Sequence, residues 1–111
     1  MRLFLLRGRS ESRVPIGVPV YLARASLPQS TELAIAADAG EHGLGVVTTR
    51  YWRRGEILQI SSITQDFSVI AKVAYCWRKL EHSYHTGLLL QNPVSGWWER
   101  LVTPTRKSKS H

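Results

Sequence analysis

Three arginines near the start of the chain, Arg7, Arg9 and Arg13, have the type and spacing of an anion-binding segment. Glycine, serine and glutamate separate them, and the segment has no hydrophobic periodicity of its own. A guanidinium group can donate two parallel hydrogen bonds to a phosphate or to the acceptor edge of guanine, and it can also lie flat on a base. The segment therefore predicts a loop that binds an anion, with a solvated run of charge as the alternative if it stands alone.

A second stretch, residues 38–43, is brought to this arginine segment by the simplest fold of the chain between them. That intervening chain alternates in hydrophobicity on either side of a polar turn, which predicts an antiparallel hairpin. A hairpin centred near Pro28 places Gly40 opposite Ile16 and Gly43 beside Arg13, within a residue or two. We therefore expect the two stretches to form one binding site.

The elements that position this site are mainly strands. Alternating apolar residues and turn residues predict six of them, over 16–22, 32–37, 44–49, 56–60, 67–77 and 84–90. Asn92 and Pro93 then introduce apolar residues at helical spacing up to Leu101, which predicts an amphipathic helix of about ten residues. The fold class expected is all-β, a six-stranded antiparallel barrel with one C-terminal helix. We divide the chain into a flexible arginine loop (1–13), the barrel with its helix (14–102) and a disordered basic tail (103–111).

Size and composition limit the possible functions. The 111 residues suffice for one domain, and 15 Lys and Arg against 8 Asp and Glu give a net charge of +7. This excess favours an anionic partner, but the charge forms separate clusters, so a long nucleic acid is not expected. The apolar run Leu3 to Leu6 is too short for a signal peptide or a membrane span, which predicts a cytoplasmic protein.

No set of residues predicts catalysis or metal binding. Cys76 is the single cysteine and lies in an apolar alternating run without an evident histidine partner. His82 and His85 are three residues apart, so on a strand they would point to opposite faces, which suits zinc poorly. We therefore expect neither an enzyme, a cofactor nor a metal site.

Two tryptophans are further candidates for contact with a base. Trp77 and Arg78, at the end of the long fifth strand, could offer a stacking face and a guanidinium group to a purine, although core packing is the favoured interpretation of Trp77. Trp52 lies among Arg50, Arg53 and Arg54, where an exposed indole would suit a nucleic acid or a protein.

Arg9-xxx-Arg13 followed by Val14-Pro15, and Asp38-x-Gly40-x-x-Gly43 before the next strand, resemble the two motifs of the PilZ domain family. These motifs are an Arg-xxx-Arg loop and an Asp/Asn-x-Ser/Ala-x-x-Gly turn. The resemblance covers nearly the whole chain, because the six strands and the C-terminal helix match the barrel of that family. It implies a bacterial receptor for the second messenger cyclic di-GMP.

The resemblance also implies roles for individual residues. Arg9 and Arg13 would contact the phosphates and the guanine acceptor edge, with Arg7 as an additional basic contact. Asp38 would accept hydrogen bonds from guanine N–H groups or hold the turn, and Gly43 would let the backbone approach the ligand. His42 lies in the same turn and could stack on a base, with a solvent-exposed loop histidine as the alternative.

One departure from the motif leaves alternatives open. Gly40 stands where the family prefers serine or alanine, so a hydroxyl contact to the ligand is lost, at a cost of about 0.5–1.5 kcal/mol. The favoured function is a cyclic di-GMP receptor or adaptor that reorders its arginine loop and signals to an effector protein. The alternatives are a diverged module that binds only protein, and a small basic barrel that binds single-stranded nucleic acid.

Overall fold

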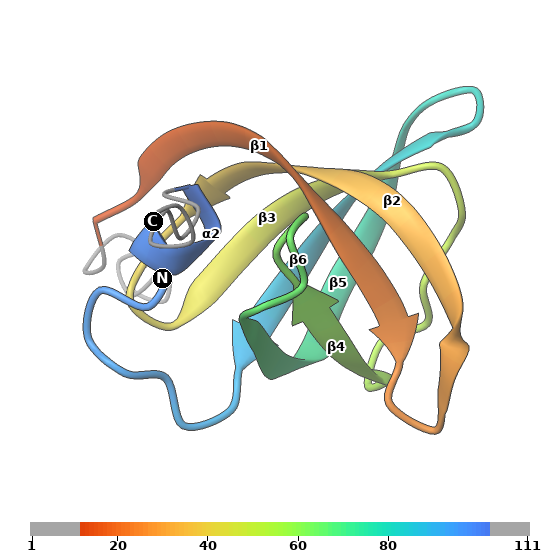
Figure 1. The fold of residues 1–111 in the computed structure, drawn as a ribbon. Coiled ribbons are helices and arrows are strands. Elements are labelled where there is room, and N and C mark those ends of the chain that lie inside the picture. Colours follow the sequence, from red (N-terminus) through yellow and green to blue (C-terminus); the bar gives the residue numbers. More distant parts are fainter. Residues whose placement is uncertain (1–11, 103–111) are drawn as a thin grey trace.

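A computed structural model describes residues 12–102 of the protein. Six antiparallel strands close into a barrel in the order β1-β2-β3-β6-β5-β4 (Figure 1), which confirms the predicted fold class. The elements are β1 (Val14–Arg24), β2 (Leu27–Ala39), β3 (Gly43–Thr48), β4 (Ile57–Ser61), β5 (Ser68–Leu80), β6 (Ser83–Leu90) and the helix α2 (Glu99–Val102). Arg7, Arg9, the rest of 1–11 and the tail 103–111 lie outside the described residues.

The barrel interior is filled by side chains from alternate positions of all six strands. Inward-facing residues of β1 such as Val20 and Leu22 are fully buried, whereas Pro19, which directly precedes Val20, is exposed on the outer face. Trp97 and Leu101 from the C-terminal segment join the same cluster, so this segment covers one end of the barrel (Figure 1). Because side chains fill the interior, a ligand has room only on the outer wall.

The first hairpin is tighter than the sequence suggested. Its turn is at Ala25 and Ser26, and Pro28 lies near the start of β2, where a proline is tolerated. Val20 therefore pairs with Ala34, and the predicted pairing of Gly40 with Ile16 is wrong.

A β-bulge then shifts the register of this hairpin once more. Gly17 has a φ of +55°, a left-handed conformation that glycine adopts without a steric cost, and it lies in the irregular stretch between Pro15 and Val18. Beyond it Pro15 pairs with Asp38, and Val14 pairs with Ala39. The aspartate is thus placed next to the entry of the chain into β1.

The C-terminal helix is shorter than predicted. Asn92 and Gly96 have φ values of +50° and +72°, which are incompatible with a helix, and only Glu99–Val102 are helical. Trp97 and Leu101 are buried as the apolar spacing indicated, but Val94 is 72% exposed. The backbone changes direction at Asn92 and again at Gly96, so apolar residues at helical spacing in the sequence do not lie on one continuous helix.

Trp52 is fully buried, so the expectation of an exposed indole in the basic turn is wrong. Its Nε1–H donates to Oε1 of Glu32 at 3.1 Å, and the guanidinium groups of Arg24 and Arg50 lie 5.2 Å and 4.6 Å from the ring. The Glu32 side chain is only 9% exposed, and its Oε2 accepts from the backbone N–H of Thr49 at 2.8 Å. These contacts hold the chain between β3 and β4 against the barrel.

Replacing Glu32 with alanine should lower the free energy of unfolding by about 1–3 kcal/mol, because it leaves the indole N–H without its acceptor in a partly buried position. Urea denaturation measures the change, with Glu81→Ala in the exposed β5–β6 turn as the control. Equal midpoints for the two variants would show that Glu32 does not stabilise the fold.

Candidate functional site

The pairing of the strands places five residues in one row around the outside of the barrel. Pro15 of β1 pairs with Asp38 of β2, Asp38 with Gly45 of β3, Gly45 with Gly87 of β6, and Gly87 with Tyr75 of β5. Directly paired residues share a face of the sheet, so all five face outward with Asp38. We refer to these residues as the outer row.

The outer surface of the barrel is recessed along the outer row, because Gly45 and Gly87 in the row, and Gly43 beside them, have no side chain. A Cβ at Gly45 would lie 3.0 Å from Oδ1 of Asp38 and 3.3 Å from Cε1 of His85, and a Cβ at Gly87 would overlap the ring of Tyr75. A Cβ at Gly43 would lie 2.8 Å from Nη1 of Arg13. The neighbouring side chains therefore lie flat against the backbone, at positions that a larger residue would occupy.

Arg13 and Asp38 form an ion pair over this surface. Nη2 of Arg13 donates to Oδ1 of Asp38 at 2.8 Å, and the two side chains are 37% and 35% exposed. Arg13 is thereby placed beside both Asp38 and Gly43, as the expected return of the hairpin required. A guanidinium group has five N–H donors, so most of its donors remain for an anion.

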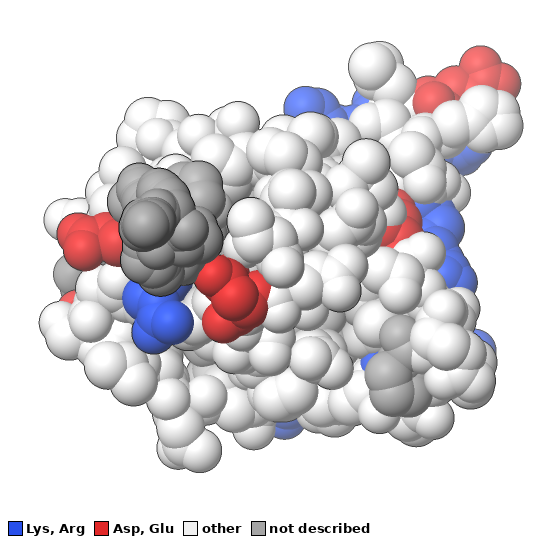
Figure 2. Space-filling view, in the orientation of Figure 1, with Lys and Arg blue, Asp and Glu red and all other residues white. Residues whose placement is uncertain are grey.

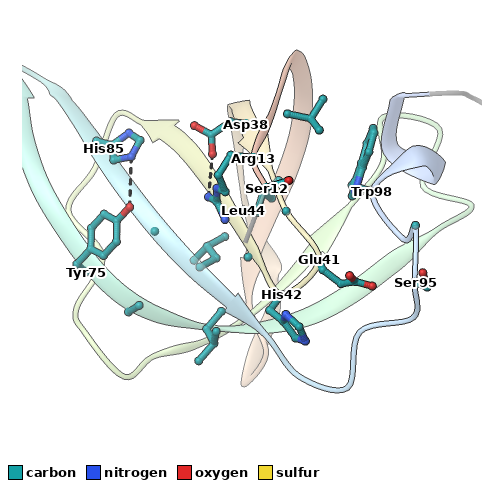
Figure 3. A pocket seen from close by; sticks show the side chains of 18 residues that line it. Ser12, Arg13, Asp38, Glu41, His42, Leu44, Tyr75, His85, Ser95 and Trp98 are labelled. Atoms are coloured by element: carbon teal, nitrogen blue, oxygen red, sulfur yellow. Dashed lines mark hydrogen bonds and ion pairs between the residues drawn. The ribbon is translucent and has the colours of Figure 1, made fainter. Parts of the chain in front are cut away.

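The ion pair lies in a cavity of about 940 Å³, in the size range of sites for small molecules. Figure 3 shows the ion pair between two groups of side chains that line this cavity. Tyr75 and His85 lie on one side, and Glu41, His42, Ser95 and Trp98 lie on the other. Of the sequence-predicted residues within 12–102, this cavity contains Arg13, Asp38, Gly40, His42 and Gly43.

The turn that carries the predicted motif is held in place by the C-terminal segment. Nε1–H of Trp97 donates to the carbonyl of Gly40 at 3.0 Å, and the Gly40 N–H donates to the carbonyl of Gly43 at 2.9 Å. The N–H of Leu90 donates to the carbonyl of His42 at 2.9 Å. The backbone of residues 40–43 is thus fixed from both sides before any ligand arrives.

Three aromatic rings extend from the cavity along β5 and β6. The ring centroids of Tyr75 and Trp77 are 4.7 Å apart at 27°, and those of Tyr75 and His85 are 5.8 Å apart at 24°. Trp77 is 63% exposed, so the favoured interpretation that it packs in the core is wrong. It faces outward because Trp77 pairs with His85 on the outer face.

The sequence reasoning missed Tyr75 and His85, and it included Arg78, which does not line the cavity. Arg78 pairs with Tyr84 further toward the β5–β6 turn. The sequence feature that could have indicated this part of the site is Gly87, because a glycine inside a strand often marks the close approach of a neighbouring group. That group is the Tyr75 ring, placed opposite Gly87 by a bulge after Val73.

Charge does not gather into one basic surface in the view of Figure 2, where acidic and basic side chains are scattered among uncharged ones. Within residues 12–102, no three His, Cys, Asp or Glu side chains are grouped so as to hold a metal ion. No helix in this part of the chain has the length and apolarity needed to cross a membrane.

No protein-family model matches the sequence, and no curated protein matches it. Among solved structures, the chain resembles the Bacillus subtilis inhibitor of motility (MotI/DgrA), with a TM-score of 0.60 and 14% sequence identity. The match covers 85% of this chain and 47% of that protein, so this chain spans about half of its length. At this identity the likeness shows a shared fold.

The ion pair should contribute little to stability, because both side chains are more than a third exposed. We expect Arg13→Ala and Asp38→Ala each to change the free energy of unfolding by less than about 1 kcal/mol. Urea denaturation at low and high salt measures the effect. A loss of several kcal/mol in either variant would assign the pair a structural role.

Proposed function

We propose that this protein is a receptor for cyclic di-GMP and binds it in the cavity around Arg13 and Asp38. The observation that carries the proposal is the partly exposed ion pair beside Gly43 and Gly45, which places a cation and a carboxylate side by side on an open surface. The two groups match a ligand that carries both phosphates and guanine N–H donors. The PilZ-like spacing of the two sequence motifs supports the same ligand.

Each residue at the centre of the cavity has a proposed role. Arg13 donates to a phosphate oxygen from the N–H groups that Asp38 does not use. Asp38 accepts from the adjacent N1–H and N2–H of a guanine, which a carboxylate can do in a bidentate manner. Gly43 and Gly40 let the ligand approach the backbone of the turn.

Arg7 and Arg9 are proposed as further phosphate contacts. They lie outside the described residues, but the chain they belong to reaches the barrel at Ser12, which lines the cavity. His42 lines the cavity on the side away from Tyr75 and could stack on the second base (Figure 3). Arg78 lies beyond the cavity, and we propose at most a long-range electrostatic contribution from it.

The role that fits this site is binding and signalling, without catalysis. We propose that the arginine segment rearranges around the dinucleotide and changes the surface that an effector protein contacts in the cytoplasm. The structural neighbour is by its name an inhibitor of motility, which describes a regulatory protein. The effector is defined only as a protein that contacts the surface next to the cavity.

Burial of Trp52 argues against the single-stranded nucleic acid alternative. That function used an exposed Trp52 together with Arg50, Arg53, Arg54 and the basic tail, and the ring of Trp52 is instead fully buried. A diverged module that binds only protein would leave the cavity unused. A titration with cyclic di-GMP separates this alternative from a receptor.

Arg13→Ala should weaken cyclic di-GMP binding by roughly 30- to 1000-fold, because it removes a charge-assisted contact at the centre of the site. Isothermal titration calorimetry of the full chain measures the dissociation constant, with GTP as the control ligand. Arg54→Ala is the matched control variant, since the turn between β3 and β4 lies at the end of β3 away from Gly43.

Wild-type affinity should also fall as salt is added, because arginine–phosphate attraction is screened. An unchanged dissociation constant in Arg13→Ala, or equal losses in the two arginine variants, would reject the proposed site.

A further inference from the structure

Three neighbouring aromatic side chains lie at one side of the cavity, and we call them the aromatic shelf (Tyr75, Trp77 and His85). Oη of Tyr75 lies 3.5 Å from Nε2 of His85, and the ring of Trp77 stacks on that of Tyr75. Tyr75 and His85 line the cavity itself, and both lie on the same side of the ion pair (Figure 3). No function assigned so far uses Tyr75 or His85.

Packing of the barrel does not account for the shelf. The core is on the other face of β5 and β6, where Val73 and Leu88 are buried. Trp77 is 63% exposed, so the largest ring of the shelf leaves most of its surface in water. An exposed aromatic surface that lines a cavity is typical of a binding site.

Gly45 and Gly87, which pair with each other, allow the rings of Tyr75 and His85 to lie close to the backbone and near Asp38. Gly87 lets the Tyr75 ring lie against the strand, and Gly45 lets His85 and Asp38 approach the same point, since its Cβ would contact both. A planar group resting on Tyr75 and His85 would therefore have one edge next to a carboxylate. This combination of a flat apolar face and an acceptor at its edge matches a nucleobase with adjacent N–H donors.

We propose that the aromatic shelf is the subsite for one guanine of the ligand, with Tyr75 and His85 stacking on the base while Asp38 binds its edge. The inference rests on the proposed function, because it assigns one base of that dinucleotide to a defined place. Stacking depends on the π face that every base has, whereas the carboxylate distinguishes guanine from adenine. The two contributions can therefore be separated by mutation.

The test is calorimetry of the full chain with cyclic di-GMP and, separately, cyclic di-AMP. Tyr75→Ala should weaken cyclic di-GMP binding by about 5- to 150-fold, the usual effect of removing one base-stacking ring. Tyr75→Phe keeps the ring and should bind nearly as wild type. Gly87→Ala displaces the ring and should resemble Tyr75→Ala.

The control variant is Tyr51→Ala, since Tyr51 is exposed and its ring contacts Tyr84 outside the cavity. Tyr75→Ala should leave the preference for guanine over adenine unchanged, whereas Asp38→Asn should reduce it. A role of Tyr75 in folding alone would lower the melting temperature without this pattern. Should Tyr75→Ala not fold, His85→Ala decides instead, because His85 is the other proposed stacking residue that lines the cavity.

The outcomes separate this inference from the proposed function. If the wild type binds cyclic di-GMP and both Tyr75→Ala and His85→Ala keep its affinity, the shelf assignment is overturned and the receptor proposal still stands. Absence of any binding by wild type would overturn both. Loss of affinity in the shelf variants, with Tyr51→Ala at the wild-type value, supports the assignment.

Discussion

A closed barrel has no free strand edge, and in this one the interior is occupied by side chains. A ligand must therefore be bound from the outer wall, where side chains normally stand at every second position of each strand. Absence of side chains at Gly43, Gly45 and Gly87 makes a low region on that wall. The ion pair, the aromatic rings and the cavity all depend on this region.

Register decides whether these residues meet at all. A shift of one residue in any strand would turn its outward side chains into the core, so the rows around the barrel are fixed by the buried faces. Irregularities near Gly17, between Ala36 and Asp38, and after Val73 adjust the rows locally. Together they bring Asp38 and Tyr75 into the same row, on strands separated in the barrel order by β3 and β6. The site is thus a consequence of the bulges as much as of the residues.

Much of the fold could be predicted, because alternating hydrophobicity directly reflects the two faces of a strand. The approach of Arg13 to the Asp38 turn also followed from a simple hairpin, even though the assumed centre at Pro28 was wrong. An error of two residues in the register moves a pairing partner by about 7 Å along the strand, which a long arginine side chain can span. The wrong pairing of Gly40 therefore did not prevent the two stretches from meeting.

Other features could not be read from the sequence, for physical reasons. The length of the last helix depends on positive φ values at Asn92 and Gly96, which apolar spacing does not report. Burial of Trp52 depends on Glu32, which is distant in the sequence. The aromatic shelf was missed because β5 and β6 are long, and only their bulged register shows that Tyr75 lies over Gly87.

A titration of the isotope-labelled protein with cyclic di-GMP, followed through its backbone amide NMR signals, tests the central claim most directly. We predict that the largest changes fall on Arg13, Asp38, Gly43, Gly45 and Gly87, with small changes in the turn between β3 and β4. Changes centred on that turn instead, or no changes at saturating ligand, would contradict the claim that the glycine-lined outer wall is the binding site.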